Sequence, residues 1–347
     1  MTRFTIITLT LVALLAAGLV LGGGYAGAAL FYITVFTFFM DKIAGLAAPD
    51  APKGAEFPAG LGLSVVLGLV HFPLLFGGAL TIGSGRLEAW EGIALFFGLA
   101  LFLGQVSNSN AHELIHRGAR APRALGVAVY TSLLFGHHAS AHRLVHHVHA
   151  ATDRDPNTAR LGEGFWRYAA RAWAGSFRQG FRAEQALSAR KRRLHPYAIY
   201  GGGALAALVG VGLLGGPSAL LAYVGLCIYA QLQLLLSDYV QHYGLMRAPR
   251  EGGRLEPMGA RHSWNARQGF SSGLMLNAPR HSDHHANPGR AYPGLRLDRE
   301  AMPILPHSLP VMAVLALVPP LWRRVMDRRA RAWTRAASFA PEPVLAE

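Results

Sequence analysis

Apolar residues in this chain fall into long uninterrupted runs. The first, from Phe4 to Met40, contains no charged side chain. It is about twice as long as the roughly 20 residues with which a helix crosses a bilayer core. Gly22–Gly24 interrupt it near the middle, so we expect two spanning helices, over about 5–21 and 25–40, joined by a tight turn. A cleaved signal peptide is the alternative, and it is disfavoured because the second half stays fully apolar.

Four more apolar runs, about 61–82, 90–106, 197–214 and 219–236, predict further spans. The expected fold class is therefore all-α, an integral membrane protein with about six transmembrane helices. Six spans place both termini on one side of the membrane. Arg86 is the only Lys or Arg in the three loops on the opposite side, so the positive-inside rule places both termini in the cytoplasm.

Two polar segments, 107–196 and 237–327, then share the cytoplasmic side. We expect a single domain, residues 1–347, in which these segments form a helical cap on the spans, followed by a flexible tail over 328–347. The apolar run from Ser308 to Trp322 is short and contains three prolines. This composition favours a buried or membrane-apposed segment over a seventh span.

Composition agrees with a membrane protein. Of the 347 residues, 52% are hydrophobic and 15% are charged, whereas soluble domains contain about 25% charged residues. The net charge is +14, and we expect the excess basic residues to lie on the cytoplasmic face of the membrane. No nucleic-acid partner is expected. The single cysteine, Cys227, excludes an intrachain disulfide.

Every histidine except His71 lies in the two polar segments. Nine of them form four clusters, and several pairs have the i, i+4 spacing that places two side chains on one helix face. The nine are His112 and His116; His142, His146 and His147; His242; and His281, His284 and His285.

Such clusters point to metal binding, because neutral imidazole binds divalent iron, zinc and copper. Nine ligands are too many for one ion and suit two ions with open positions. Because imidazole is uncharged, the site avoids burying several carboxylates beside the bilayer. The other ring nitrogen of a metal-binding histidine needs a hydrogen-bond partner. Candidates for such supporting roles are Glu113, Asp153, Asp155, Asp238, Asp283, His137 and His138.

Two alternatives explain part of this pattern. His112-Glu113-x-x-His116 is the signature of zinc proteases, with the glutamate as base, but it leaves the seven other clustered histidines without a role. A metal transporter needs polar ligands along a path through its spans, where His71 is the only histidine. Both alternatives are therefore disfavoured.

The clusters and the residues around them resemble the membrane-bound alkane monooxygenase family, which includes the xylene and cymene monooxygenases. That family shares its histidine clusters with the fatty acid desaturases and hydroxylases. The likeness extends from about Phe38 to Asp327. The matching segments are Ala111–His116, His142–His147, Ala151–Pro156, Asp238–Leu245, Arg280–Pro288, Leu317–Trp322 and Val325–Asp327.

The resemblance implies a reaction and its components. Two iron ions held by the nine histidines would use O2 and two electrons to hydroxylate a hydrocarbon methyl group to a primary alcohol. Rubredoxin or ferredoxin would supply the electrons. The protein would lie in a bacterial inner membrane in contact with membrane lipid, and a hydrocarbon dissolved in the bilayer would enter laterally between the spans.

Some residues depart from the family's usual pattern: Ala141, Arg143–Val145, Asp238 and Gln241. They leave n-alkanes and alkyl-aromatic compounds both open as substrates, and a fatty-acyl desaturase or hydroxylase is the nearest rival activity. Arginine-rich stretches around 167–193 and 323–331 are candidates for docking an acidic electron donor. Contact with anionic lipid explains them equally well, and it is favoured for the basic run 190–193.

Overall fold

The computed structural model describes residues 1–43, 50, 55, 57–191 and 194–337. Every regular secondary-structure element in this part of the chain is a helix. Its β-structure consists of two isolated bridges, which join Pro249 to Leu255 and Asn265 to Ile304. The predicted all-α fold class is confirmed.

Five of the described helices are long and apolar enough to cross a membrane. The first is α1 (Thr2–Leu21), and the second is a continuous rod made of α2 (Gly24–Phe31), η1 (Tyr32–Phe36) and α3 (Thr37–Ile43). Between them, Gly22 and Gly23 have φ angles of 64° and 60°. Glycine adopts this left-handed conformation at little cost, so the chain reverses direction within two residues, as the sequence predicts.

The third and fourth spanning helices are also composite rods. They are α4 (Pro58–Phe72) with η2 (Pro73–Gly77) and α5 (Gly78–Gly83), and α6 (Ala89–Leu101) with η3 (Phe102–Ser107) and α7 (Asn108–Ile115). A capping box between Glu88 and Glu91 starts the fourth rod. This rod continues past the predicted end of the span at residue 106, so one uninterrupted helix carries the first histidine pair out of the membrane.

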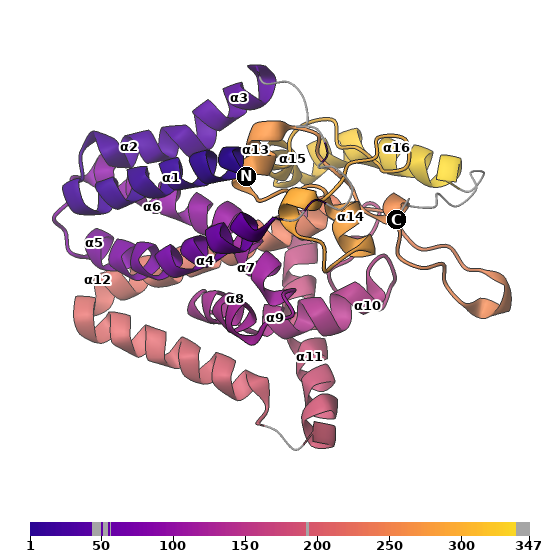
Figure 1. Cartoon of the computed structure of the whole chain (residues 1–347), viewed down its shortest axis with the longest axis horizontal. Coiled ribbons are helices and arrows are strands. Elements are labelled where there is room, and N and C mark those ends of the chain that lie inside the picture. The colour runs from indigo at the N-terminus through magenta and orange to yellow at the C-terminus, as the bar shows by residue number, and fades with distance from the viewer. Residues whose placement is uncertain (44–49, 51–54, 56, 192–193, 338–347) are drawn as a thin grey trace.

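The fifth helix, α12 (Pro196–Gln241), contains 46 residues, or about 69 Å of helix, which is roughly twice a bilayer core. Gly216 leaves the helical conformation at φ 67° and ψ −167°, and Pro217 follows. The helix turns back there, at the same end of the molecule as the α1–α2 and α5–α6 turns (Figure 1). Its two limbs, 196–215 and 217–241, complete the expected set of about six crossings.

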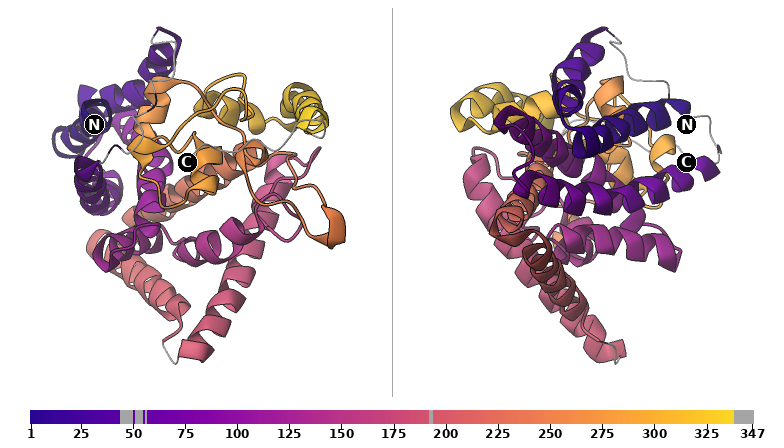
Figure 2. Two further views of the ribbon diagram at one scale, coloured as in Figure 1. Left: turned by 45° about the vertical axis from the view of Figure 1, so that its right-hand side comes forward. Right: turned by 90° about the vertical axis from the view of Figure 1, so that its left-hand side faces the viewer.

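The remaining helices gather toward the other end of the spans and form the cap (Figures 1 and 2). They are α8 (Arg120–Ser132), α9 (His137–Ala141), η4 (His142–His146), α10 (His147–His149), α11 (Phe165–Lys191), η5 (Glu251–Gly253), η6 (Ala260–His262), α13 (Gly269–Leu274), α14 (His281–Ala286), η7 (Tyr292–Gly294), α15 (Leu309–Ala316) and α16 (Pro319–Ala337). Because α15 has only eight residues, the proline-containing run is not one spanning helix.

The last helix, α16, reaches into the segment predicted to be a flexible tail. Met326, Ala330 and Trp333 are spaced at i, i+4 and i+7, so they share one helix face. The first two are buried, and the Trp333 indole N–H donates to the Arg261 carbonyl at 3.1 Å. These contacts hold the helix as far as Ala337. Residues 338–347 of the predicted tail lie outside the described residues.

Close packing between η3 and the second limb of α12 brings two histidine-bearing ends together. A Cβ atom added at Gly104 would lie 2.6 Å from the Gln233 Cβ, a distance that real Cβ atoms do not tolerate. A residue without a side chain is therefore required where the two helices cross. Beyond this crossing one rod continues to His112, and the limb of α12 ends at His242.

Candidate metal centre

The nine predicted histidines come from four places in the chain and meet at the membrane end of the cap. They are carried by α7 and its C-cap, by η4 with α10, by the C-cap of α12, and by α14. They separate into two groups, and within each group the potential ligand atoms all lie within 4.8 Å of one another. The structure thus brings together all nine residues that the sequence singles out.

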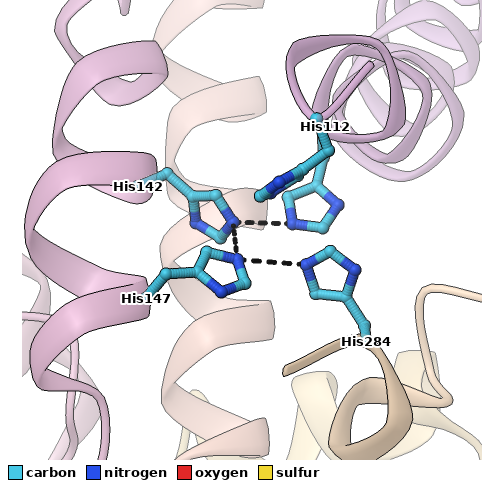
Figure 3. A group of neighbouring side chains, drawn as sticks. His112, His142, His147 and His284 are labelled. Carbon is cyan, nitrogen blue, oxygen red and sulfur yellow. Dashed lines mark hydrogen bonds between the residues drawn. The ribbon is translucent and has the colours of Figure 1, made fainter. Parts of the chain in front are cut away.

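The first group contains five histidines: His112, His116, His142, His147 and His284. The Nε2 atom of His142 lies 2.8 Å from that of His112 and 3.0 Å from that of His147. The Nε2 atoms of His147 and His284 are 3.2 Å apart. Figure 3 shows these rings converging from three separate segments. His112, His116 and His147 are partly exposed, so this group is open on one side.

The second group contains four histidines, all buried: His146, His242, His281 and His285. The Nε2 atom of His285 lies 3.2 Å from that of His146, 3.2 Å from that of His242 and 3.1 Å from that of His281. The two groups adjoin each other, because the ring centroids of His147 and His285 are 4.8 Å apart.

These separations fit metal ligation better than hydrogen bonding. Nitrogen ligands at about 2.0–2.1 Å from one shared ion lie roughly 3 Å from each other, as the ring nitrogens do here. A hydrogen bond needs one N–H and one lone pair, and the single Nε2 of His285 faces three other Nε2 atoms. In addition, His116 Nε2 is buried and has no hydrogen-bond partner among the described residues. An all-imidazole donor set is suited to iron, zinc or copper.

The second histidine cluster, His142, His146 and His147, does not have the α-helical geometry that the sequence predicts. In an α-helix His142 and His146, at i and i+4, would share a face. The segment His142–His146 is instead π-helical, and the backbone N–H of His147 donates to the carbonyl of His142, five residues earlier. A wider turn aligns i with i+5. His142 and His147 therefore serve one group while His146 serves the other.

One predicted carboxylate contacts a clustered histidine directly. Asp155 Oδ2 lies 2.9 Å from His146 Nδ1, and it also accepts a hydrogen bond from the Thr158 hydroxyl at 2.7 Å. The backbone N–H of Asn157 donates to Asp155 Oδ1 at 3.1 Å. Burial lowers the pKa of His146, but the charge and hydrogen bond of Asp155 outweigh it and raise that pKa above the usual value. The contact holds the Nδ1 proton and leaves Nε2 to face the second group.

Asn157 links this contact to a second buried carboxylate, since its side-chain amide donates to Asp238 Oδ2 at 2.7 Å. Asn157 and Thr158 are therefore supporting residues that the sequence analysis did not name. The signal was present in the Asp-Pro-Asn-Thr run, because an aspartate commonly accepts from the backbone N–H two residues later.

The other predicted carboxylates have different surroundings. Among described residues, Glu113 pairs with the Arg117 guanidinium and accepts from the Tyr292 backbone N–H at 3.3 Å. Asp283 is buried and accepts from Arg290 Nη1 at 2.6 Å, which holds the loop after α14. Asp153 is exposed.

The two supporting histidines, His137 and His138, lie at the start of α9, just before the second cluster. His138 is buried, and its ring centroid lies 5.2 Å from that of His142. His137 packs instead against Phe135, Trp173 and Phe177, at centroid distances of 4.7, 5.2 and 5.2 Å. Neither belongs to a nitrogen group among the described residues.

Burial of His137 predicts a measurable dependence of stability on pH. Burial lowers its pKa from 6.5 to about 4. Below pH 6.5 the unfolded chain therefore takes up a proton that the folded chain does not, and the unfolding free energy falls by up to roughly 3 kcal/mol as the pH approaches 4. Replacing His137 with Phe should reduce the loss of melting temperature between pH 7.5 and pH 5. An identical pH profile in the variant would contradict this assignment.

A small cavity of about 70 Å³ touches both histidine groups. His112, His142 and His281 line it, so both groups border the same space. The rest of its lining mixes apolar and polar side chains. The apolar ones include Leu234, Met275, Leu309, Pro310 and Ala313, and the polar ones include Gln105, Asn108, Ser109, Tyr130, His138, Gln233, Ser237, Asp238 and Gln241. A molecule held there meets both groups at once.

The fold and the site together define a class of protein: an all-helical membrane protein whose spans end at two adjoining groups of histidine nitrogens. The chain matches the family model described as fatty acid desaturase over residues 88–316. It is 32% identical to alkane 1-monooxygenase 1 of Pseudomonas aeruginosa over 308 residues, which cover 84% of this chain and 79% of that relative.

Two further relatives extend the comparison. Alkane 1-monooxygenase 2 of Pseudomonas aeruginosa is 30% identical over 312 residues, covering 85% of this chain and 81% of the relative. The xylene/toluene monooxygenase hydroxylase component of Pseudomonas putida is 28% identical over 311 residues, covering 85% and 79%. The chain therefore belongs to the fatty acid desaturase family, among its alkane 1-monooxygenase members, and is a membrane monooxygenase.

The position of Glu113 separates a monooxygenase from the zinc-protease alternative. In a protease this residue would be the base and its loss would abolish activity. Here its described contacts hold Arg117 and Tyr292, so Glu113→Gln is expected to keep hydroxylation within about tenfold of wild type. Product formation by gas chromatography and metal content are the measurements. A variant that is inactive with its metal content unchanged would contradict the supporting role.

Proposed function

We propose that this protein uses O2 to hydroxylate a hydrocarbon methyl group to a primary alcohol at a pair of iron ions held by the nine histidines. The observation that carries the proposal is the pair of adjoining nitrogen groups that line one cavity at the end of the spans. Relatives named as alkane and xylene/toluene monooxygenases support hydrocarbons as the substrate class.

The histidines would act as neutral ligands, five for one ion and four for the other. Burial lowers the pKa of His142, His284 and His285 well below 6.5, and neighbouring histidines lower it further. Their lone pairs are thus available at neutral pH. Bound iron would supply the activation of O2, with hydrocarbon, O2, two electrons and two protons consumed and the alcohol and water released.

The cavity suits the end of a hydrocarbon chain. With about 70 Å³ the cavity is far smaller than the roughly 300–1,000 Å³ of sites that enclose a whole small molecule, so the rest of a longer substrate must extend elsewhere. Leu309 and Ala313 line the cavity from α15, while Val314 of the same helix is 67% exposed. We infer that α15 separates the cavity from lipid and that a hydrocarbon reaches the metals beside it. Either an n-alkane or an alkyl-aromatic methyl group fits this arrangement.

The cap is proposed to face the cytoplasm of a bacterial cell, with the protein in the inner membrane. The turns at Gly22–Gly24 and Gly216 carry no basic residue, and the α5–α6 turn carries only Arg86. Among the described residues, the other basic side chains lie toward the opposite end of the spans, which the positive-inside rule places in the cytoplasm. Leu213, which is 82% exposed, illustrates the apolar outer surface that such a position requires.

We propose that an acidic rubredoxin or ferredoxin docks where α11 and α16 begin. The two helices meet there, since the Trp166 indole N–H donates to the Leu317 carbonyl at 3.3 Å. Arg167, Arg323 and Arg324 are exposed around this junction. Complementary charge would accelerate docking more than it would strengthen the complex.

Docking by charge predicts that turnover depends on salt. Raising NaCl from about 50 to 300 mM shortens the range of electrostatic attraction, so kcat/KM for reduced rubredoxin should fall about tenfold. Arg323→Gln with Arg324→Gln should weaken this dependence, whereas the exposed Arg299→Gln, between two acidic neighbours, should not. Salt-independent turnover in the wild-type protein would argue against docking at this surface.

The activity itself is tested by whole-cell conversion. Cells that express the protein with a rubredoxin or ferredoxin and its reductase are fed octane, dodecane and xylene under air, and alcohols are measured by gas chromatography. A terminal alcohol supports the proposal and ranks the substrates. If iron-loaded protein in the membrane yields no alcohol from any of these compounds but changes the acyl chains of membrane lipid, the activity is that of a fatty-acyl desaturase or hydroxylase.

A further inference from the structure

A groove of about 680 Å³ lies outside the metal centre, between the first limb of α12, α8 and the α4–η2 rod. Its volume is within the range of specific ligand sites. Most of its lining is apolar and includes Phe72, Phe76, Val127, Ala128 and Ile199. Figure 1 shows the first limb of α12 diverging from α4 and α8 over this region.

The limb that forms one wall is scarcely covered by protein. Every residue from 196 to 215 is described, and Val211 is the one buried among them. Ile199, Leu205 and Leu214 are 57%, 61% and 79% exposed. An apolar helix of this kind is stable only where lipid covers it, so the groove lies at the depth of the membrane and opens toward acyl chains.

Two basic side chains mark the end of the groove where α8 begins. The charged residues in its lining are Arg120 and Arg123, at i and i+3 of α8. Arg120 is exposed, and its guanidinium pairs with no other described residue. Arg123 donates from Nε to the Arg117 carbonyl at 3.2 Å and from Nη2 to the Gly118 carbonyl, which leaves its Nη1 for a phosphate. Because α8 follows α7 directly beyond the histidines, these cations lie at the membrane surface on the side of the cap.

We propose that this groove binds one anionic phospholipid, with its phosphate at Arg120 and Arg123 and an acyl chain along the apolar lining. The charge of the two arginines selects an anionic headgroup. The hydrocarbon substrate is a poorer occupant, because it has no group for either arginine. α8 also separates the two spaces: Tyr130 lines the cavity at the histidines, and Thr131 and Ser132 line the groove.

A second groove provides an internal control. It has a volume of about 470 Å³ and lies on the other side of the same limb, against α9 and α11. Its lining includes Trp173, Phe177, Tyr197 and Ala204 and no charged side chain. Acyl chains of any lipid suit that groove, whereas the groove with the arginines should discriminate between headgroups.

The test is native mass spectrometry of the purified full-length protein, titrated with dioleoylphosphatidylglycerol or dioleoylphosphatidylcholine. One phosphatidylglycerol should bind at least about tenfold more tightly than phosphatidylcholine. Arg120→Gln with Arg123→Gln should remove about thirtyfold of that affinity, and Arg120→Gln alone about fivefold, which covers the case in which losing Arg123 impairs folding. The exposed Arg328→Gln on α16 should leave the affinity unchanged.

A second pair of variants tests the groove rather than the charge. Ala128→Trp places an indole in the proposed site and should prevent phosphatidylglycerol binding, whereas Ala204→Trp fills the uncharged groove and should not. Equal binding of the two lipids, or unchanged binding in the arginine or Ala128 variants, would overturn the proposal. Competition by inorganic phosphate at the same concentration would also overturn it, because it would show a simple anion site.

Discussion

His284→Ala and His285→Ala are each expected to abolish hydroxylation, and each should remove a different metal ion. The two residues are adjacent on α14, yet His284 belongs to the group of five histidines and His285 to the group of four. Loss of one ligand from a closely matched set opens the site to water and lowers its affinity for the ion. Activity should fall by at least about 100-fold in both variants.

Metal analysis of the purified variants distinguishes this arrangement from a single shared site. Iron should fall from about two to about one per chain in each variant, and to nearly none when both histidines are replaced. The exposed His307→Ala is the control and should retain full iron and activity. A variant at His284 or His285 that keeps both ions and normal turnover would remove that residue from the ligand set.

Asp155→Asn is expected to lower hydroxylation by about 10–100-fold, the range found when the hydrogen-bond partner of a metal-binding histidine is lost. Asp155 Oδ2 lies 2.9 Å from His146 Nδ1 and also accepts from Thr158. An asparagine side chain is neutral, so it no longer raises the pKa of His146 or favours the Nδ1 proton. The imidazole then binds more weakly through Nε2.

The matched control for this change is Asp153→Asn, two residues earlier in the same loop. Asp153 is exposed, so its replacement should leave activity within about twofold of wild type. Turnover and iron affinity are compared in the two variants at the same pH. Equal losses at both positions would show that the loop needs general negative charge, and no loss at Asp155 would contradict its contact with His146.

The membrane-spanning helices could be predicted from the sequence, because the preference for lipid is a property of each side chain and does not depend on its neighbours in the fold. A continuous apolar run and two glycines at positive φ define the α1–α2 hairpin regardless of what packs beside it. The bend of α12 is similarly local, since Gly216 and Pro217 interrupt the helix themselves. The limit of the fourth span is less exact, since the helical rod that begins at Ala89 continues past residue 106 to Ile115.

The histidines of the candidate metal centre were also accessible from the sequence. Imidazole is the side chain whose chemistry suits several divalent metals, and its clustering at fixed spacings is visible without a structure. Carboxylates were harder to assign, because proximity along the chain does not fix the direction of a side chain. Asp153 and Asp155 are equivalent by sequence distance, yet one is exposed and the other contacts His146.

By itself, therefore, the sequence determined that this is a helical membrane protein with nine clustered histidines, because apolar length and ligand chemistry are properties of single residues and short segments. The tertiary structure decided which histidines act together. The π-helical turn from His142 to His146 sends His146 to one group and His147 to the other, and α14 divides His284 from His285 in the same way. That division depends on the directions in which four separate helices point their side chains, which only their packing against one another sets.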